Sequence, residues 1–198
     1  MATLDKIQLI GYAAIIVIIV SLATIGVKFT GFATANSTAV VNVTIVSSAA
    51  INFTTNFMDF GGGSVTAGFA NATVNTEGLT QGGNWSAPLN NLTLENIGST
   101  NVSLALLSNK NASAFIGGTA PLFQFKLIND TKPLSCVGNN VSTTWTNLTT
   151  SQLNVCTVFP YDDSKDQLTI EIQLSIPYDS PTSSTAKTAT ITAMGTYT

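Results

Sequence analysis

The sequence predicts a mainly β protein, in which one long N-terminal hydrophobic α-helix precedes an antiparallel β-sandwich of the jelly-roll or immunoglobulin-like class. Three observations carry this prediction. A long apolar segment without charge lies near the N-terminus. About nine later segments alternate apolar and polar residues, and short runs of Gly, Pro, Asn and Ser separate them instead of a second helical pattern.

The first predicted element is the helix over residues 7–27. This segment contains no charged residue and is bounded by Lys6 and Lys28. At about 1.5 Å per residue it would be roughly 31 Å long, which matches the apolar thickness of a bilayer. Its assembly or membrane face is assigned to Ile7, Ile10, Ile15, Ile16, Val17, Ile18, Ile19, Val20, Leu22 and Ile25.

The sequence leaves three roles open for this helix. It is a signal peptide cleaved near Ala33-Thr34-Ala35, a permanent membrane anchor, or a filament core in which copies of the helix pack together. Each role brings the segment into contact with a membrane at least during assembly. We therefore divide the chain into the helix and its hinge, residues 1–34, and an extracellular domain, residues 35–198.

The domain contains nine candidate strands. The clearest is Leu168–Ile176, a strict alternation that ends in a turn with Pro177 and Asp179. The strands are expected at 38–46, 50–58, 68–75, 91–96, 100–107, 122–128, 153–159, 167–176 and 186–197.

N-glycosylation sequons, N-x-S/T, are more frequent than random placement of Ser and Thr would give. In Val41-Asn42-Val43-Thr44 the asparagine alternates with apolar residues, so a half-buried strand would turn it outward. This placement predicts N-glycans at Asn36, Asn42, Asn52, Asn71, Asn84, Asn91, Asn101, Asn111, Asn129, Asn140 and Asn147.

The two cysteines, Cys136 and Cys156, each lie beside strand-like sequence and form no metal-binding CxxC pattern. In an exported protein a disulfide is expected between them, the alternative being two separate buried thiols.

The composition excludes several functions. The chain has no His, seven Lys as its only cationic side chains, and a net charge of −3. Without His the chain lacks an imidazole that could act as a general base or as a metal ligand. Without Arg it lacks a guanidinium group that could bind phosphate through two hydrogen bonds. We expect no nucleic-acid partner, no cofactor, no metal, no small-molecule substrate and no enzymatic activity.

Two weaker patterns have an ordinary alternative. The loop Asp162-Asp163-Ser164-Lys165-Asp166 offers oxygen ligands for Ca²⁺ but also fits a polar turn before a strand. Trp85 and Trp145 are candidates for stacking on sugars, or for anchoring the core and loops.

The C-terminal part resembles a known group of surface proteins. Leu168–Ile176, the turn Pro177-Tyr178-Asp179-Ser180-Pro181 and the strand Lys187–Thr192 resemble the end of archaeal surface β-sandwich proteins and of the TasA/camelysin-like filament proteins. Glu95-Asn96-Ile97-Gly98 resembles a turn of the same group. The helix followed by a glycosylated sandwich is similar to the plan of archaeal type IV pilins and archaellins.

These resemblances imply a structural subunit of an extracellular, cell-surface, pilus-like filament with a role in adhesion. Its partners would be further copies of itself, N-glycans, and a membrane during assembly. Copies would join through the helix, through strand addition, or through both. The alternative is a monomeric, membrane-anchored adhesion or binding module.

Overall fold

The computed structural model describes residues 42–44, 46–88, 90–128, 132–138 and 144–198. The chain divides into two compact units, residues 1–44 and 45–198, and every described strand lies in the second. The helix predicted over residues 7–27 lies outside the described residues. Within the described part of the chain, no helix is both long enough and apolar enough to cross a membrane.

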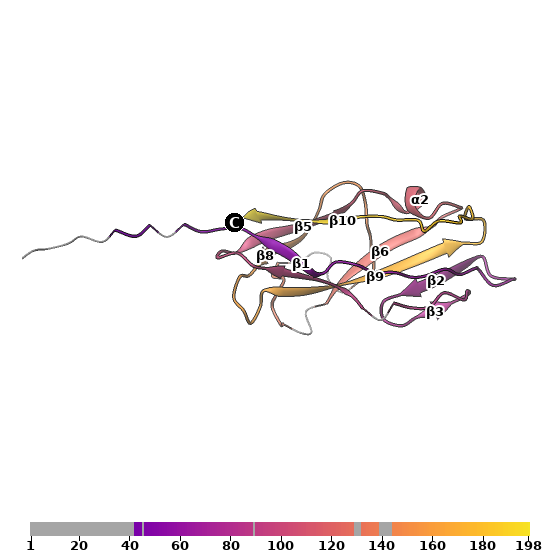
Figure 1. Ribbon diagram of the computed structural model, residues 1–198, viewed down its shortest axis with the longest axis horizontal. Coiled ribbons are helices and arrows are strands. Elements are labelled where there is room, and N and C mark those ends of the chain that lie inside the picture. The colour runs from indigo at the N-terminus through magenta and orange to yellow at the C-terminus, as the bar shows by residue number, and fades with distance from the viewer. Residues whose placement is uncertain (1–41, 45, 89, 129–131, 139–143) are drawn as a thin grey trace, which may run out of the picture. The chain divides into compact units, whose positions relative to one another are not determined.

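Residues 45–198 confirm the prediction of a mainly β, antiparallel fold. The described residues form two sheets, and every pairing between their strands is antiparallel (Figure 1). The larger sheet contains β1 (Ile51–Thr55), β2 (Asn71–Asn75), β3 (Thr80–Gln81), β4 (Leu92–Asn96), β6 (Leu122–Ile128), β7 (Thr146–Asn147) and β9 (Gln167–Pro177). The smaller sheet contains β5 (Val102–Ser108), β8 (Leu153–Phe159) and β10 (Ile191–Tyr197), with β5 in the middle.

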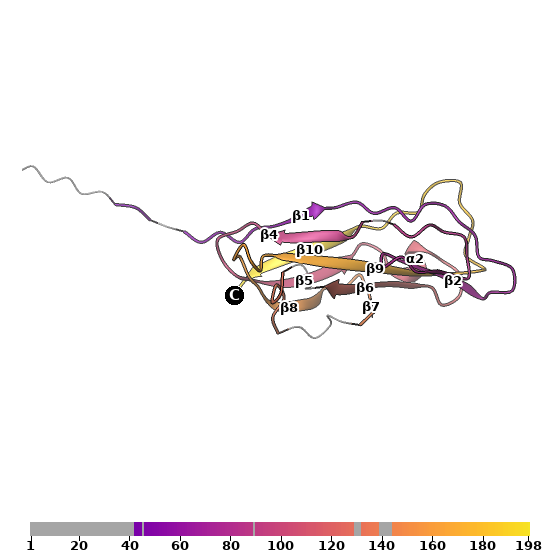
Figure 2. The same ribbon diagram turned by 90° about the horizontal axis from the view of Figure 1, so that it is seen from below.

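Strand β9 is the centre of the larger sheet (Figure 2). One of its edges pairs with β6 over seven residues, from Leu122↔Ser175 to Ile128↔Thr169. Its other edge is shared: β4 pairs with Gln167–Ile170, and β2 pairs with Gln173–Pro177. One eleven-residue strand therefore aligns three others.

The core lies between the two sheets and follows from the two-residue period of a strand. In β9 the even-numbered residues from Leu168 to Leu174 are buried in the core, whereas Thr169 and Gln173 are only partly buried on the other face. The smaller sheet contributes alternate residues of β5, namely Val102, Leu104 and Leu106. Local alternation thus determines which face of each strand packs.

Three features of the observed fold differ from the prediction. Of the strand expected over 38–46, the described residues 42–44 and 46 belong to no strand, which corrects that prediction. The two-residue strands β3 and β7 were not predicted, because they are too short to show an alternation of apolar and polar residues. The helix α2 (Ala112–Phe115) was not predicted; the side chain of Asn111 caps it by accepting from the backbone N–H of Ala114 at 2.8 Å.

The turn after β4 is organised by a buried asparagine, Asn96. Its Nδ2 donates to the backbone oxygens of Thr100 and Phe159, both at 3.0 Å, and its Oδ1 accepts from the N–H of Gly98. Any Cβ at residue 98 would lie 2.3 Å from the backbone oxygen of Ser48, so this position requires glycine. The Glu95-Asn96-Ile97-Gly98 turn thus joins β4, the end of β8 and the segment that enters β1.

The turn after β9 is held by an exposed carboxylate. Asp179 accepts hydrogen bonds from the N–H and the Oγ1 of Thr119, at 2.9 and 2.7 Å. These two bonds lower the pKa of Asp179 below its ordinary value of 3.8, because they stabilise the ionised form. The turn is thereby fixed to the loop that follows α2.

We predict that Asn96→Ala lowers the free energy of unfolding by about 2–3 kcal/mol, because the carbonyl groups of Phe159, which is buried, and of Thr100, which is half-buried, lose their donor. Chemical denaturation of the purified domain measures the change. The control is Asn154→Ala on the exposed side of β8, which should change stability by less than about 0.5 kcal/mol. Equal stabilities for the Asn96 variant and wild type would contradict the proposed role of this side chain.

We predict that Asp179→Asn destabilises the domain in a pH-dependent way. Since the pKa of Asp179 is lower in the folded chain than its ordinary value of 3.8, its contribution is complete above that pH and disappears as the pH falls through the folded-state pKa. The stability difference between wild type and variant should therefore be present near neutral pH and should shrink as the pH falls below 3.8. Denaturation curves across this range measure it, with the exposed Asp163→Asn as the control; a difference independent of pH would refute the prediction.

Candidate functional site

The outer face of the larger sheet carries a group of sequon asparagines. Strand register places all of them on the side away from the core: Asn52 is opposite Glu95, and Asn147 is opposite Gln124. Asn71 lies on the same face, where its Nδ2 donates to Ser175 Oγ at 2.8 Å. All three side chains are exposed, as a glycan acceptor requires.

Other sequons lie in loops. Asn84, Asn101 and Asn111 are exposed and border strands or α2, and Asn42 is exposed in the smaller unit of the chain. The predicted acceptors Asn36, Asn129 and Asn140 lie outside the described residues. Of the described sequon asparagines, Asn91 alone is not exposed.

Asn91 is engaged inside the sheet. Its Nδ2 donates to Glu171 Oε1 at 2.9 Å, and its Oδ1 is buried without a hydrogen-bond partner among the described residues. Glu171 is itself only 7% exposed. A glycan is attached to Nδ2, so the folded chain offers little access to this acceptor.

Asn91 is engaged in this way because two strands, β2 and β4, share one edge of β9. Strand β2 ends where Asn75 faces Gln173, and β4 begins where Leu92 faces Ile170, which leaves Glu171 at the junction. The Glu171 carboxylate accepts from Thr76 Oγ1 as well as from Asn91. A buried carboxylate with neutral donors thus closes the gap between the two strands.

The predicted disulfide between Cys136 and Cys156 is present. Both cysteines are buried, and their Cα atoms are 5.2 Å apart. Beside it, the N–H of Val137 donates to the backbone oxygen of Val158 at 2.9 Å. The bond attaches the loop before residue 138 to β8, and closing a loop of this length contributes about 3 kcal/mol in the chain-entropy description.

Two carboxylates of the acidic loop 162–166 are engaged by other groups of the protein. Asp162 accepts from the N–H and Oγ of Ser164, which lowers the pKa of Asp162. Asp166 is buried and pairs with Lys132; this hydrogen bond raises the pKa of Lys132. The described part of the chain contains no group of three or more Cys, Asp or Glu side chains arranged to hold a metal ion.

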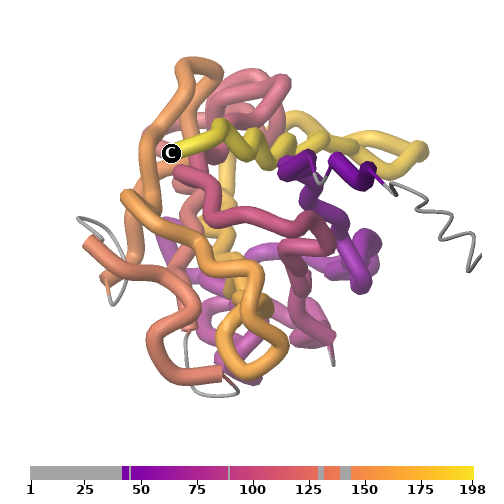
Figure 3. The backbone as a smooth tube through the Cα atoms, turned by 90° about the vertical axis from the view of Figure 1, so that its left-hand side faces the viewer, coloured from indigo at the N-terminus to yellow at the C-terminus, as the bar shows by residue number. Residues whose placement is uncertain are grey.

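An apolar mouth is open between the edge strands of the two sheets, β1 and β10. The two strands come together where Ile51 packs over Gly195, and Figure 3 shows them at the same side of the domain. Next to this contact the mouth encloses about 200 Å³, lined by Ile51, Phe53, Leu94, Ile191, Thr192 and Ala193. Among the described strands each pairs on one edge only, β1 with β4 and β10 with β5. The other edge of each strand therefore presents backbone groups outside any described strand pairing, beside an apolar surface.

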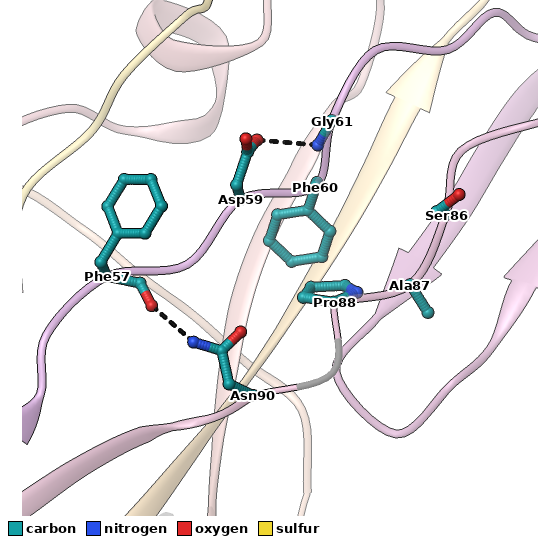
Figure 4. Close-up of a pocket in the computed structure, with 8 residues that line it drawn as sticks. All are labelled: Phe57, Asp59, Phe60, Gly61, Ser86, Ala87, Pro88 and Asn90. Carbon is teal, nitrogen blue, oxygen red and sulfur yellow. Dashed lines mark hydrogen bonds between the residues drawn. The ribbon is translucent and has the colours of Figure 1, made fainter.

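A second groove of about 360 Å³ is lined by Phe57, Asp59, Phe60, Gly61, Ser86, Ala87, Pro88 and Asn90 (Figure 4). The ring of Phe60 lies over Pro88, whereas Phe57 projects away from them and is 70% exposed. Two polar side chains of the groove are hydrogen-bonded within the loops. Asp59 accepts from Gly61 N–H, and Asn90 Nδ2 donates to the Phe57 carbonyl. Sequence reasoning missed this groove, because its residues lie in two loops without a recognisable motif.

Neither tryptophan is an open platform for a sugar. The ring of Trp85 packs so closely on Gly63 and Gly83 that a Cβ at either glycine would lie within 3 Å of it. Trp145 is half-buried, with the Nζ of Lys126 4.9 Å from its ring centroid. The structure thus places both residues in loop and sheet packing.

Fold and site together define a disulfide-linked antiparallel β-sandwich with sequon asparagines on the outer face of one sheet. Comparisons with protein-family models, with curated proteins and with solved structures give no match for this chain.

We predict that Asn91 carries no glycan in the folded protein, whereas Asn52 does. Glycopeptide mapping of protein from a cell that glycosylates N-x-S/T sequons measures both. Thr93→Ala and Thr54→Ala provide the matched controls, since each removes one sequon and keeps its asparagine. The first should leave the glycan mass unchanged and the second should remove one glycan. A glycan found at Asn91 would refute the prediction.

Proposed function

We propose that this chain is a structural subunit of an extracellular, cell-surface filament with an N-glycosylated β-sandwich. Copies join when a strand from one subunit adds to an open edge of the next, together with packing of the helices predicted over residues 7–27. The observation that carries the proposal is a pair of complementary features. One is a segment with the pattern of a strand whose described residues pair with no strand, and the other is the open apolar mouth between β1 and β10.

The candidate donor segment is residues 41–46, Val-Asn-Val-Thr-Ile-Val. Val43 and Val46 are each 81% exposed, an unusual state for a β-branched apolar side chain. In a strand, the alternation would place Val41, Val43 and Ile45 on one face and the sequon residues Asn42 and Thr44 on the other. A strand added through this segment would bury three apolar residues and leave Asn42 in solvent.

The acceptor offers what such a strand requires. The open edges of β1 and β10 supply backbone donors and acceptors, and the mouth between them supplies an apolar floor that includes Phe53 and Ile191. Strand addition combines these two contributions: main-chain hydrogen bonds give affinity, and pockets for alternate side chains fix the register.

Register within the subunit favours a donor from a second copy. Ser48 pairs with Ser99 through two hydrogen bonds, 2.8 and 2.9 Å long, in the same register that joins Ile51 to Asn96 in β1 and β4. The chain therefore enters β1 in a straight line from Ser48 onward. For residues 41–46 to lie beside β1 of their own subunit, the chain would have to reverse before Ser48.

We predict that Val43→Asp abolishes filaments, because it places a charge on the face that enters the apolar mouth. Val46→Asp is the matched control: the same change, at an equally exposed residue on the opposite face, should leave filaments intact. The measurement is negative-stain microscopy of material sheared from cells that export the full chain. Neither variant should change the melting temperature of the domain.

Two outcomes would refute parts of the proposal. If the wild-type chain occurs only as a monomer in the membrane fraction, the anchored binding module replaces the filament subunit. If Val43→Asp forms wild-type filaments while Ile16→Asp or Ile18→Asp forms none, the helix assembles the polymer without strand addition.

A further inference from the structure

We infer that the loop between β9 and β10 carries O-linked sugars on the hydroxyl groups of residues 182–185, Thr-Ser-Ser-Thr. This modification site is separate from the N-glycan acceptors, since no N-x-S/T sequon begins after Asn147. The inference rests on the extracellular location in the proposed function, and it does not depend on polymerisation. The composition of the loop, its projection from the domain and its hydrogen bonds carry it.

The first observation is composition. Residues 182–185 form the longest uninterrupted run of Ser and Thr in the chain, and Pro181 precedes this run. Six of the ten residues 181–190 carry a hydroxyl group. Segments rich in Ser, Thr and Pro are typical acceptors of O-linked sugars, because proline restricts the backbone and the small side chains leave their hydroxyl groups accessible.

The second observation is that the loop projects from the domain. The Ser180 hydroxyl group donates to the backbone oxygen of Gly117, and the Lys187 ammonium group donates to that of Ile116. Two consecutive residues at the end of α2 thus hold both ends of the loop, so residues 181–186 between them must extend away and return. All of residues 181–186 are exposed, and Figure 2 shows a projecting gold loop between β9 and β10.

The third observation concerns the hydrogen bonds of these side chains. Ser183 Oγ lies 3.2 Å from Thr185 Oγ1 and accepts from the N–H of Thr185. Within the described part of the chain, none of the four hydroxyl groups bonds to a residue outside the loop. Elsewhere such groups join distant segments, as Thr119 does with Asp179. Contacts within the described fold therefore do not account for four consecutive hydroxyl side chains at this position.

The reaction that these hydroxyl groups fit is transfer of a sugar from an activated donor. The hydroxyl oxygen attacks the anomeric carbon of a sugar carried on a nucleotide or a polyprenyl phosphate. The new C–O bond forms as the bond from that carbon to the phosphate oxygen breaks, and the phosphate leaves with the electron pair. The hydroxyl proton passes to a base of the transferase. This chain is thus the acceptor substrate, and the enzyme and the donor come from the cell that exports it.

The test is mass spectrometry of the full chain, isolated from the surface of the cell that naturally produces it. Trypsin cleaves after Lys165 and Lys187, so one peptide, residues 166–187, contains all four hydroxyl groups and no N-glycan sequon. We expect this peptide to gain the mass of one or more sugars, and electron-transfer fragmentation to place them within residues 182–185. Thr169 and Ser175 of β9 are the internal control in the same peptide, since they are half-buried and buried and should stay unmodified.

Variants made in the same cell sharpen the test. Replacing the four residues together, as Thr182→Ala, Ser183→Ala, Ser184→Ala and Thr185→Ala, should return the peptide to its unmodified mass. The matched control is Thr188→Ala, which removes an exposed hydroxyl group just outside the run and should leave the sugars in place. Because the readout is the mass of a peptide, it does not depend on the stability of the variants.

The outcomes separate this inference from the proposed function. An unmodified peptide 166–187, or sugars on Thr169 or Ser175 and none on residues 182–185, would overturn the inference. Filaments formed by such a chain would leave the proposed function standing. Sugars on residues 182–185 of a chain that forms no filaments would support the inference and overturn the proposed function.

Discussion

Three neighbouring strands of the larger sheet depend on β9, because this one strand supplies their hydrogen bonds and one wall of the core. β6 occupies one edge, and β4 and β2 share the other. The apolar side of β9 from Leu168 to Leu174 packs against the smaller sheet, and each such side chain contributes roughly 1.5–3 kcal/mol when fully buried. Because β4 and β2 share one edge of β9, Glu171 lies at the junction between them, where neither strand pairs with it. Its carboxylate accepts hydrogen bonds from Thr76 and Asn91 there.

Much of this architecture follows from the sequence, since alternation is a local property. Strands β6 and β8 have the predicted bounds, 122–128 and 153–159, and β9 extends the predicted strand by one residue. The disulfide was equally predictable, as two cysteines beside strands in a chain without metal-binding spacing have few other roles. Strands as short as β3 and β7 cannot be recognised this way, because two residues contain no period.

Where the structure adds to or departs from the sequence patterns, contacts between distant residues are the cause. The sequon at Asn91 is a three-residue pattern, but its availability depends on Glu171, which is 80 positions away. Residues 42–44 and 46 have the pattern of a strand and no strand partner among the described residues. A pattern states that a segment is suited to pairing; it does not state which chain supplies the partner. On the proposed function, that missing partner is another subunit.

A chain with 9% charged residues and no Arg or His has few ion pairs with which to specify contacts between copies. Strand addition does not need them, because its hydrogen bonds come from the backbone and its register from apolar alternation. Backbone edges are also indiscriminate, since any exposed strand can pair with any other. Glycans on the outer face of the larger sheet would restrict where pairing and packing occur. On the proposed function, specificity in such a polymer would arise from excluded surfaces more than from attractive charges.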